Sequence, residues 1–573
     1  MNKIMLGNEA VARGLYEAGV KVVSSYPGTP STEITEFVST YDEIYSEWAS
    51  NEKVAAEAAF GACMAGARSF TAMKHVGLNV AADLLFTASY TGVNGGFVIA
   101  VADDSGMHSS QNEQDSRHYA ISSKVPMLEP SDSAECLEFT KKAFEISEKF
   151  DTPVILRLST RVSHSQSIVK LSERNEVGLK EYVKNPQKYV MMPGNARPRH
   201  TFVENRTKEL SLYGDTSELN KIIKGGKIGV ITSGIAYQYA REALGDKATY
   251  LKLGLINPLP EKLIRDFAKD FDKLYIIEEL DPVIETACKS MGLNTIGKEL
   301  FSLEGEYTAT IIKEKILGEK TEFICLDETV PVRPPVLCPG CPHRGIFYVL
   351  SKLKLHVSGD IGCYTLAAQL PLGAMDSTIC MGASISGLHG FNKAVGEASE
   401  KNSVAVIGDS TFIHSGITGL IDIAYNASNT TVIILDNSIT GMTGHQQNPT
   451  TGFTIKGEPA NAVNLEALCK AIGIKRVCVV DPFDLDACEK TVKAELAADE
   501  PSVIITRRPC ALLKSVKPAP AVKINAEKCK KCKMCLKIGC PAIKNSDNGI
   551  VIDSTLCTGC GLCKNVCKFG AIE

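Results

Sequence analysis

The sequence has no apolar run long enough to serve as a secretion signal or to cross a membrane. Its first ten residues, MNKIMLGNEA, contain charged and polar side chains at short intervals. The most apolar region, residues 76–102, is interrupted by Asn79, Asp83 and Asn94, whereas a membrane-spanning helix needs about 20 consecutive apolar residues. We therefore expect no signal peptide and no membrane partner, and we interpret this region as buried α/β structure.

No segment is both basic and rich in aromatic side chains, so we expect no nucleic-acid partner. The missing secretion signal also bears on the 20 cysteines of the chain, because disulfides form mainly in secreted proteins. Cysteines in this number indicate metal ligands and free thiols in a reducing compartment. We expect a cytoplasmic protein.

What the sequence does contain is typical of a large globular protein. Hydrophobic residues make up 44% and charged residues 22% of the 573 positions, and the length predicts about three to five domains. Apolar runs followed by helical patterns and glycine-rich turns predict α/β domains with doubly wound parallel sheets. The clearest apolar runs are residues 20–30, 95–106, 227–236, 273–282, 403–411 and 431–438.

Breaks in composition divide the chain into four pieces. Residues 170–225 are charged and lack apolar periodicity, and residues 328–345 and 514–523 are rich in proline. We interpret the last break as a semi-rigid linker, because proline fixes φ and disfavours helix. The predicted domains are residues 1–170, 190–320, 335–510 and 524–573, with the linker at 511–523.

Eight cysteines in the last 45 residues form two matching runs, C-x2-C-x2-C-x4-C-P and C-x2-C-x2-C-x3-C. Runs of this spacing hold two [4Fe–4S] clusters, and the fourth cysteine of each run binds the other cluster. The spacing assigns one cluster to Cys529, Cys532, Cys535 and Cys567. It assigns the other cluster to Cys557, Cys560, Cys563 and Cys540. The alternative is a pair of zinc sites, but these usually use cysteine pairs or mixed cysteine and histidine sets, and this segment has no histidine.

The two runs depart from the expected spacing in two places. The first run has four residues rather than three before its last cysteine, and Lys568 stands where a second Cys-Pro is expected. Both differences fit a longer loop and a lost proline. The clusters indicate a chain that transfers electrons, and the module predicts a small α+β ferredoxin domain.

Charge is distributed unevenly along the chain. The formal net charge is −4, but residues 521–573 contain nine lysines against four acidic residues. This basic segment is either a solvated surface or a docking face for an acidic electron carrier, drawn in by complementary potential.

A second constellation lies at the ends of two apolar runs, at Gly408-Asp409 and at Asn437 to Ile439. It resembles the diphosphate-binding motif of thiamin-diphosphate enzymes. The resemblance implies that Asp409, Asn437 and the carbonyl of Ile439 bind Mg²⁺, which prefers hard oxygen ligands. Gly408 then lets the backbone approach the phosphates. The alternative is an ordinary strand-to-helix turn.

Residues 51–62 are a candidate for the segment that binds the pyrimidine ring of thiamin. This segment resembles the helix of the pyrimidine-binding domain, whose leading glutamate bonds the N1′ nitrogen of the aminopyrimidine. By that resemblance Glu52 is the catalytic carboxylate, in preference to Glu57. The alternative is an exposed carboxylate at a helix start, which the helix dipole favours in any case.

The turn at residues 26–32, Tyr-Pro-Gly-Thr-Pro-Ser-Thr, is characteristic of 2-oxoacid:ferredoxin oxidoreductases. With the other motifs, the whole chain resembles the large α subunits of indolepyruvate ferredoxin oxidoreductases. The resemblance implies a pyrimidine-binding domain at 1–170, a transketolase C-terminal-like domain at 190–320, a diphosphate-binding domain at 335–510 and a ferredoxin domain at 524–573.

The implied reaction is oxidative decarboxylation of an aryl 2-oxo acid, such as indolepyruvate, with coenzyme A and ferredoxin, to the aryl-acetyl-CoA and CO2. Iron–sulfur clusters suit this chemistry because they accept single electrons at low potential. The implied partners are a smaller β subunit, in a hetero-oligomer with two copies of each chain, and an acidic acceptor ferredoxin. Three alternatives remain: action on another 2-oxo acid, non-oxidative decarboxylation, and an electron-transfer subunit with a vestigial thiamin site.

Candidate substrate residues follow from the same motifs. Thr29 lies in the motif turn, and His75 is a candidate for binding the oxo or carboxylate group, although a lone histidine is often structural. Arg157 and Arg161 are able to bind a carboxylate bidentately, or else to form surface or interface ion pairs.

Related oxidoreductases hold a further [4Fe–4S] cluster close to the thiamin. The resemblance implies that a third cluster is bound here by Cys338, Cys341, Cys363 and Cys510. The alternatives are buried free thiols, or a zinc site formed by Cys338, Cys341 and His343.

Overall fold

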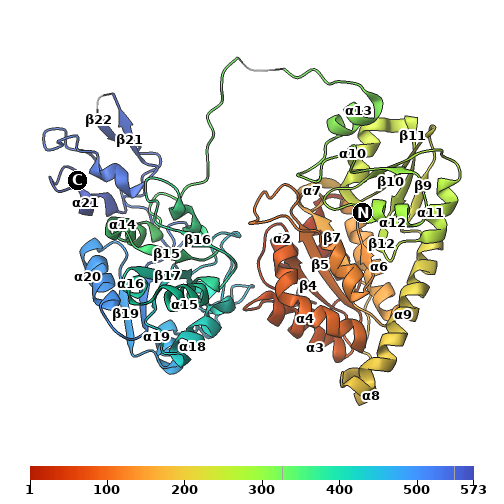
Figure 1. The fold of residues 1–573 in the computed structure, drawn as a ribbon, viewed down its shortest axis with the longest axis horizontal. Helices are drawn as coiled ribbons and strands as arrows, with labels where there is room; N and C mark the ends of the chain where they lie inside the picture. The colour runs from red at the N-terminus through yellow and green to blue at the C-terminus, as the bar shows by residue number, and fades with distance from the viewer. Residues whose placement is uncertain (325–326, 548) are drawn as a thin grey trace. The chain divides into compact units, whose positions relative to one another are not determined.

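The computed structural model describes residues 1–324, 327–547 and 549–573. The chain forms two compact units, Met1–Asp327 and Glu328–Glu573, whose elements are labelled in Figure 1.

The first unit contains a seven-stranded sheet in the order β12-β6-β7-β5-β4-β2-β3. All neighbours are parallel except β12 and β6. Its central strand β5 (Phe97–Asp103) has the sequence FVIAVAD and is buried at every position, as a strand covered on both faces requires. The other strands are β2 (Val22–Ser25), β3 (Tyr45–Trp48), β4 (Ser69–Lys74), β6 (Met127–Leu128), β7 (Val154–Ser159) and β12 (Leu255–Asn257).

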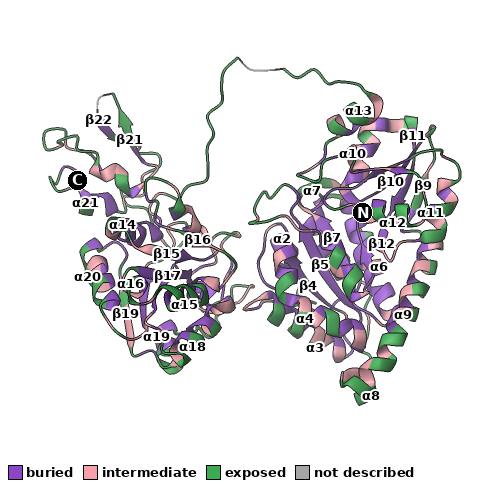
Figure 2. Ribbon diagram, in the orientation of Figure 1, coloured by how far each residue is buried: buried purple, intermediate pink, exposed green. Residues whose placement is uncertain are grey.

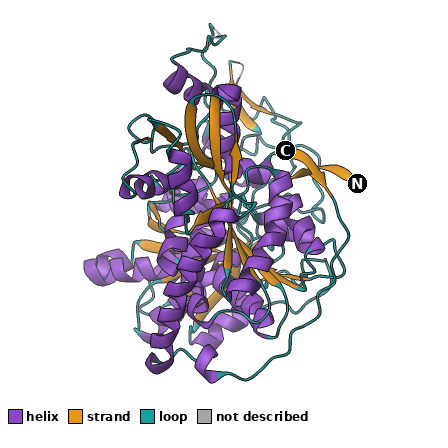
Figure 3. Ribbon diagram, turned by 90° about the vertical axis from the view of Figure 1, so that its right-hand side faces the viewer, coloured by secondary structure: helices purple, strands orange, loops and turns teal. Residues whose placement is uncertain are grey.

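Figure 3 shows the helices and strands of the chain by colour, and β4, β5 and β7 are coloured as largely buried in Figure 2. Strands β1 (Asn2–Leu6) and β8 (Gln166–Lys170) form a separate antiparallel pair. The helices in this part of the chain are α1 (Gly7–Glu17), α2 (Thr32–Val38), α3 (Glu52–Met64), α4 (His75–Thr91), α5 (Arg117–Ser123), α6 (Ser133–Phe150), α7 (Thr160–His164), α8 (Pro186–Tyr189) and α9 (Pro193–Thr216).

The first unit has a second sheet of five strands in the order β14-β13-β10-β11-β9, parallel except for β9. The two sheets share one apolar core, which includes Ile99 and Ile155 from the first and Ile231 and Leu251 from the second. The elements of this part are β9 (Lys221–Ile223), β10 (Ile228–Ser233), α10 (Gly234–Leu244), β11 (Ala248–Leu253), α11 (Glu261–Ala268), β13 (Leu274–Ile277), α12 (Val283–Ser290), β14 (Thr295–Ile296) and α13 (Ala309–Leu317).

The second unit contains a six-stranded, fully parallel sheet in the order β16-β15-β17-β18-β20-β19. Its central strands β17 and β18 are buried throughout. The elements are α14 (His343–Leu353), β15 (His356–Gly359), β16 (Ser377–Thr378), α15 (Ala383–Val395), α16 (Glu397–Glu400), β17 (Ser403–Gly408), α17 (Asp409–Thr411), α18 (Ile417–Tyr425), β18 (Thr431–Asp436), α19 (Leu465–Ile472), β19 (Arg476–Val480), α20 (Leu485–Leu496) and β20 (Ser502–Arg507).

The cysteine-rich C-terminal segment packs on this sheet domain and does not form a separate core. Its regular elements are a 3-10 helix η4 (Met534–Ile538), the antiparallel hairpin β21 (Ile543–Ser546) and β22 (Gly549–Ile552), and helix α21 (Leu562–Val566). Phe347 of α14 belongs to the same apolar core as Val522, Ile538 and Leu562. The position of the cysteines relative to the sheet is therefore fixed by side-chain packing.

The predicted fold class is confirmed, because each of the six apolar runs contains a strand of a mainly parallel sheet. The second predicted piece contributes β12 to the first sheet, so pieces one and two fold together as a single unit. Among the described residues, none of the helices combines the length and the apolar character that crossing a bilayer requires.

Buried charges connect the two sheets of the first unit. Arg117 pairs with Asp115 at 2.6 Å and with Glu278, and it donates to the carbonyl of Glu279 at 2.9 Å. The Glu279 carboxyl group accepts a hydrogen bond from the Tyr307 N–H at 2.9 Å. Burial raises the pKa of Glu279 to about 7, so the folded unit favours its protonated form.

This shift predicts how the stability of the first unit depends on pH. Between pH 4.5 and about 7, Glu279 is protonated in the folded unit and ionised in the unfolded chain, so stability falls as pH rises through this window. We expect Glu279→Gln to remove this part of the dependence and to stabilise the unit at pH 8 by about 3 kcal/mol. Urea unfolding at pH 5 and pH 8, followed by fluorescence of Trp48, the single tryptophan of the chain, measures it. Equal pH dependence in both proteins would contradict the assignment.

Candidate functional site

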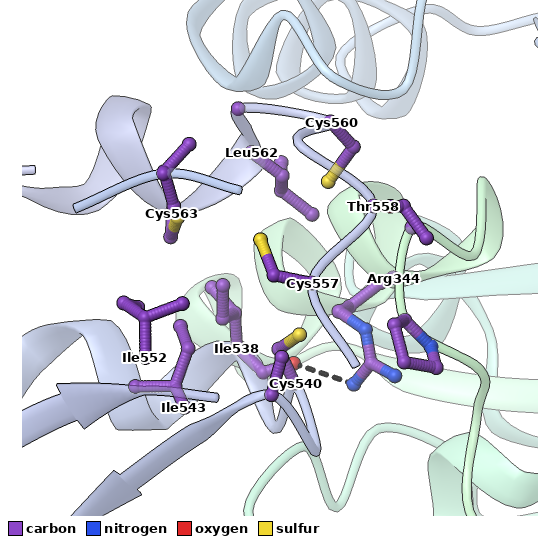
Figure 4. Close-up of a pocket in the computed structure, with 15 residues that line it drawn as sticks. Arg344, Ile538, Cys540, Ile543, Ile552, Cys557, Thr558, Cys560, Leu562 and Cys563 are labelled. Atoms are coloured by element: carbon purple, nitrogen blue, oxygen red, sulfur yellow. Dashed lines mark hydrogen bonds between the residues drawn. The ribbon is translucent and has the colours of Figure 1, made fainter. Parts of the chain in front are cut away.

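The eight C-terminal cysteines gather in two groups of four, each around its own cavity. One cavity is lined by Cys540, Cys557, Cys560 and Cys563, whose side chains Figure 4 shows. Cys540 comes from the first run and the other three from the second. The structure thus brings together the four thiols that the spacing assigned to one cluster. We call this the inner cavity.

The second cavity collects the other predicted set. It is lined by Cys529, Cys532, Cys535 and Cys567. Ile524 and Ile550 complete its apolar wall, while Lys530 and Lys533 stand at the exposed side. An apolar shell around thiolates limits solvent access, which is one of the ways in which proteins set cluster potentials. We call this the outer cavity.

The spacing of these thiols bears on the alternative of zinc sites. With Zn–S bonds of about 2.3 Å, thiolates around one zinc ion lie roughly 3.8 Å apart. Among the described residues, no three cysteine sulfur atoms lie within 4.8 Å of one another. The described thiols therefore do not form the closed set of ligands that surrounds a zinc ion.

The four cysteines of the predicted third set also converge. The Cys341 N–H donates to the Cys338 carbonyl at 3.1 Å in a tight turn, and the Cys510 N–H donates to the Asn437 carbonyl at 3.0 Å. Burial, together with the nearby Cys510 and Cys338, raises the pKa of the Cys363 thiol to about 11. The set therefore lies against Asn437, one of the predicted magnesium ligands.

The predicted magnesium ligands lie at the carboxyl ends of the adjacent parallel strands β17 and β18. Asp409, Asn437 and Ile439 are all buried, with exposed fractions of 3%, 7% and 2%. Burial, together with the neighbouring Asp436, raises the pKa of the Asp409 carboxyl to about 7. A bound divalent cation favours the ionised carboxylate, so this donor set is chemically suited to Mg²⁺.

The packing around these ligands explains why residue 408 is a glycine, and it places His343 in contact with Asn437. A Cβ atom on Gly408 would lie 2.8 Å from the Tyr364 ring, so only glycine fits there. His343 Nε2 lies 3.3 Å from Asn437 Nδ2, and burial lowers the His343 pKa to about 4. The imidazole is therefore neutral and accepts the amide N–H. The sequence suggested His343 only as a zinc ligand, and no spacing signal connects it with Asn437.

In the segment that is predicted to bind the pyrimidine ring, Glu52 is the first residue of α3 and is 4% exposed. The alternative of an exposed carboxylate is therefore wrong. Asn51 caps the helix by accepting the Val54 N–H at 2.8 Å. A Cβ atom on Gly77 would lie 2.7 Å from Glu52 Oε1. The first turn of α4 therefore needs glycine to leave room for this carboxylate.

The structure adds Lys74 to this region. Lys74 is 9% exposed, and its ammonium donates to the Ser109 carbonyl at 3.0 Å. Its side chain lies 3.4 Å from the position of a Cβ on Gly28, in the motif turn that contains Thr29. Burial lowers the Lys74 pKa, and the charges of Asp104 and Glu52 oppose this shift. No ion pair joins Lys74 to a carboxylate in the described parts of the chain.

His75 follows directly and starts α4. Its Nε2 lies 3.2 Å from the Asn112 carbonyl, while its Nδ1 is buried and makes no hydrogen bond in the described structure. Burial lowers the His75 pKa, so the ring is neutral. The sequence singled out His75 but missed Lys74, although Lys74 directly precedes it at the end of an apolar run.

The two candidate arginines are engaged by protein carboxylates. Arg157 is buried and pairs with Asp103 at 2.8 Å and with Glu129. Arg161 bonds both carboxylate oxygens of Glu306, at 2.8 and 2.6 Å. These contacts match the alternative of structural ion pairs and leave Lys74 as the buried cation nearest the motif turn.

Comparisons with known proteins identify three segments. Residues 13–213 match the family "Pyruvate flavodoxin/ferredoxin oxidoreductase, thiamine diP-bdg", residues 360–506 match "Thiamine pyrophosphate enzyme, C-terminal TPP binding domain", and residues 550–573 match "4Fe-4S binding domain".

Similarity to individual proteins extends over the whole chain. The indolepyruvate oxidoreductase subunit IorA of Archaeoglobus fulgidus is 39% identical over 99% of this chain and 97% of its own length. The chain belongs to the IorA family. The IorA protein of Pyrococcus horikoshii is 40% identical over 100% of this chain and 96% of its own length. A more distant relative, 2-oxoglutarate synthase subunit KorA of A. fulgidus, is 25% identical over 49% of this chain and 88% of its own length.

Membership of the IorA family confirms the resemblance drawn from the motifs, and the chain is an oxidoreductase subunit of the 2-oxo acid:ferredoxin type. The two thiamin segments contain Thr29 and Glu52 in one case and Asp409 and Asn437 in the other. The iron–sulfur match covers the second cysteine run only.

In this IorA-family chain, Gly340 holds the Cys338–Cys341 turn against the ferredoxin segment. Its φ is +73°, and a Cβ there would lie 2.5 Å from Thr558 Oγ1. Gly340→Ala introduces backbone strain and also forces Thr558 to shift. We expect it to lower the free energy of unfolding of the second unit by roughly 1–3 kcal/mol more than a substitution that introduces the backbone strain alone. Gly457→Ala is the control, since Gly457 has a φ of +79° and nothing within 4 Å of its Cβ position.

Hydrogen exchange at the Ala519 N–H, which donates to the Thr558 carbonyl at 3.0 Å, reports the contact directly. Faster exchange in Gly340→Ala than in Gly457→Ala is the expected result. Equal exchange in the two variants would show that the turn does not press on Thr558.

Proposed function

We propose that this chain is the thiamin- and cluster-binding subunit of an enzyme that oxidatively decarboxylates aryl 2-oxo acids. The substrate is indolepyruvate or a related acid, and coenzyme A and ferredoxin are co-substrates, giving the aryl-acetyl-CoA and CO2. The relatives that match the full length of the chain carry the name indolepyruvate oxidoreductase. The observation that carries the proposal is that Asn437 contacts the third cysteine set within the same unit that holds both cluster cavities.

In the second unit, Asp409, Asn437 and the Ile439 carbonyl hold Mg²⁺ and through it the diphosphate of thiamin. Their burial, the close approach allowed by Gly408 and the all-oxygen donor set fit this group. Thiamin diphosphate supplies an electron sink for the electrons released by decarboxylation. Neutral His343 orients the Asn437 amide through the 3.3 Å contact, and the amide oxygen, which accepts the Ile439 N–H at 3.3 Å, keeps a second lone pair for a cation.

In the first unit, Glu52 holds a proton at the pyrimidine N1′ nitrogen. Its buried position at the start of α3 and the space left by Gly77 fit a carboxylate that faces a ligand and not solvent. Thr29 and His75 contact the 2-oxo acid, and the neutral ring of His75 offers a hydrogen bond without a competing charge.

The inner and outer cavities each hold a [4Fe–4S] cluster, and Cys338, Cys341, Cys363 and Cys510 hold a third. The third set lies against Asn437 on one side, and its turn meets Thr558, between two cysteines of the inner cavity, on the other. This arrangement supports a path from thiamin to the third cluster, then to the inner and outer clusters.

The partners follow from the charge around the outer cavity. Lys530 and Lys533 line it and are exposed, and the exposed Lys531 and Lys568 adjoin its lining residues in the sequence. A basic rim of this kind attracts an acidic ferredoxin and steers its approach. The name of the relatives as subunits supports a second subunit. We expect this subunit to be smaller and the complex to contain two copies of each chain.

Lys74 binds the carboxylate of the 2-oxo acid. A buried ammonium without an anionic partner is costly, and a substrate carboxylate removes that cost beside Thr29. We expect Lys74→Met to lower kcat/KM for the 2-oxo acid by about 10–100-fold, because a hydrogen bond to a charged group contributes roughly 1.5–3 kcal/mol.

Lys53→Met is the control for Lys74. Lys53 lies on α3 but is exposed and pairs with Glu57, so steady-state kinetics of this variant are expected to match the wild type. Partial recovery in Lys74→Arg would support the charge interaction. An unchanged kcat/KM in Lys74→Met would remove Lys74 from the substrate site.

The proposed activity is tested with the protein purified anaerobically together with its small subunit. We expect coenzyme A-dependent reduction of ferredoxin with indolepyruvate at a higher kcat/KM than with pyruvate or 2-oxoglutarate. A preference for pyruvate or 2-oxoglutarate would overturn the aryl substrate, and aldehyde release without ferredoxin would indicate non-oxidative decarboxylation. Intact clusters without any reduction or thiamin binding would indicate a vestigial thiamin site.

A further inference from the structure

Arg344 is a buried cation whose surroundings contain no carboxylate partner. It is the second residue of α14 and is 2% exposed. Its guanidinium donates to the backbone carbonyls of Ile538 at 2.9 Å, Leu337 at 2.5 Å and Cys338 at 3.1 Å. Its Nε is buried and lacks a hydrogen-bond partner, and no ion pair to Asp or Glu is present in the described structure.

The groups around Arg344 are thiols of two different cysteine sets. Arg344 lines the inner cavity together with its four cysteines, and Figure 4 shows the guanidinium bonded to the Ile538 carbonyl beside Cys540. Electrostatic interactions also link it to Cys338 and Cys341. The same guanidinium thus bonds the Cys338 carbonyl in the third set and the Ile538 carbonyl two residues before Cys540.

An arginine does not lose its proton in a protein, and a buried charge is costly unless an opposite charge lies nearby. Backbone carbonyls accept hydrogen bonds from its two Nη groups but not from Nε, and they supply no net negative charge. A [4Fe–4S] cluster with four thiolates is dianionic when oxidised and trianionic when reduced, so it becomes a stronger counter-charge after accepting an electron.

We propose that Arg344 is the counter-charge of the inner cluster and raises its reduction potential. The reduced, more negative cluster gains more from the cation than the oxidised cluster does, so electrons arriving from the third cluster are held at the inner cavity. Arg344 is a positioning residue for electron transfer and takes no part in bond making. The inference rests on the proposed function only for the presence of the clusters.

The outer cluster is expected to be independent of Arg344. Its neighbouring cations, such as Lys530 and Lys533, are exposed, so water and salt screen their charges. A change at Arg344 therefore acts selectively on the inner cluster, and more weakly on the third cluster through Cys338 and Cys341.

The test is an EPR-monitored redox titration of the anaerobic complex without substrate, so an inactive enzyme with intact clusters still gives an answer. The variants are Arg344→Gln, which removes the charge, and Arg344→Lys, which keeps it. Lys517→Met is the control, because it removes an exposed positive charge from the linker of the same unit. The signal of the outer cluster is assigned with Cys532→Ser.

In Arg344→Gln we expect the inner cluster to bind its electron at least tenfold more weakly, a shift of about 59 mV to more negative potential for a one-electron couple. Arg344→Lys keeps most of the wild-type potential, and the outer cluster is unchanged in every Arg344 variant. Loss of inner-cluster iron from the Gln variant but not from the Lys variant would also support the proposal.

Three results would overturn the proposal. One is an unchanged inner potential in Arg344→Gln with full iron content. Another is an equal shift in Lys517→Met. The third is loss of inner-cluster iron from both Arg344 variants, because it would show that guanidinium geometry, and not its charge, is what the inner cavity needs.

Discussion

The second unit depends on the apolar core that α14 shares with the C-terminal segment. Phe347 and Ile346 on one side and Val522, Ile538 and Leu562 on the other are buried in a single cluster. Close packing of this kind resists displacement, because interiors have few voids. The core therefore fixes the cysteines of the inner cavity relative to the sheet whose strand ends carry Asp409 and Asn437, and electron transfer needs distances that do not fluctuate.

The first turn of α14 contacts both the predicted magnesium ligands and the inner cavity. His343 contacts Asn437, and Arg344, the next residue, lines the inner cavity. Consecutive residues of a helix project about 100° apart, so one turn is able to serve two sites. The turn that precedes the helix supplies Cys338 and Cys341, and Gly340 allows its close approach to Thr558.

Buried charges in the protein divide into two kinds. Arg117 and Arg157 form ion pairs with Asp103, Asp115 and Glu278. These carboxylates balance the arginine charges inside the folded unit. Lys74 and Arg344 donate to backbone carbonyls and form no ion pair in the described structure, although the charges of Asp104 and Glu52 act on Lys74. This difference separates structural cations from cations that face a substrate or a cluster.

Sequence patterns predicted the features that local spacing encodes. The cysteine runs, the apolar strands and Glu52 at a helix start are such features. The structure places the eight cysteines around two cavities in the two sets that the spacing assigned, with the fourth cysteine of each run at the other cavity. Contacts made by packing between distant segments were not predictable. β12 joins the first sheet from residue 255, His343 meets Asn437 across 94 positions, and Arg344 reaches Ile538 across 194. The ion pairs of Arg157 also arise from such packing, since they join four separate strand ends and loops.

The proposed electron path requires three cubane clusters within the second unit, from Asn437 to the outer cavity. Iron analysis combined with Mössbauer spectroscopy of the anaerobic protein tests it most directly. We expect about 12 iron atoms per chain, all in [4Fe–4S] clusters, and about eight in Cys363→Ser with the two ferredoxin-type clusters retained. About eight iron atoms in the wild type, unchanged by Cys363→Ser, would contradict it.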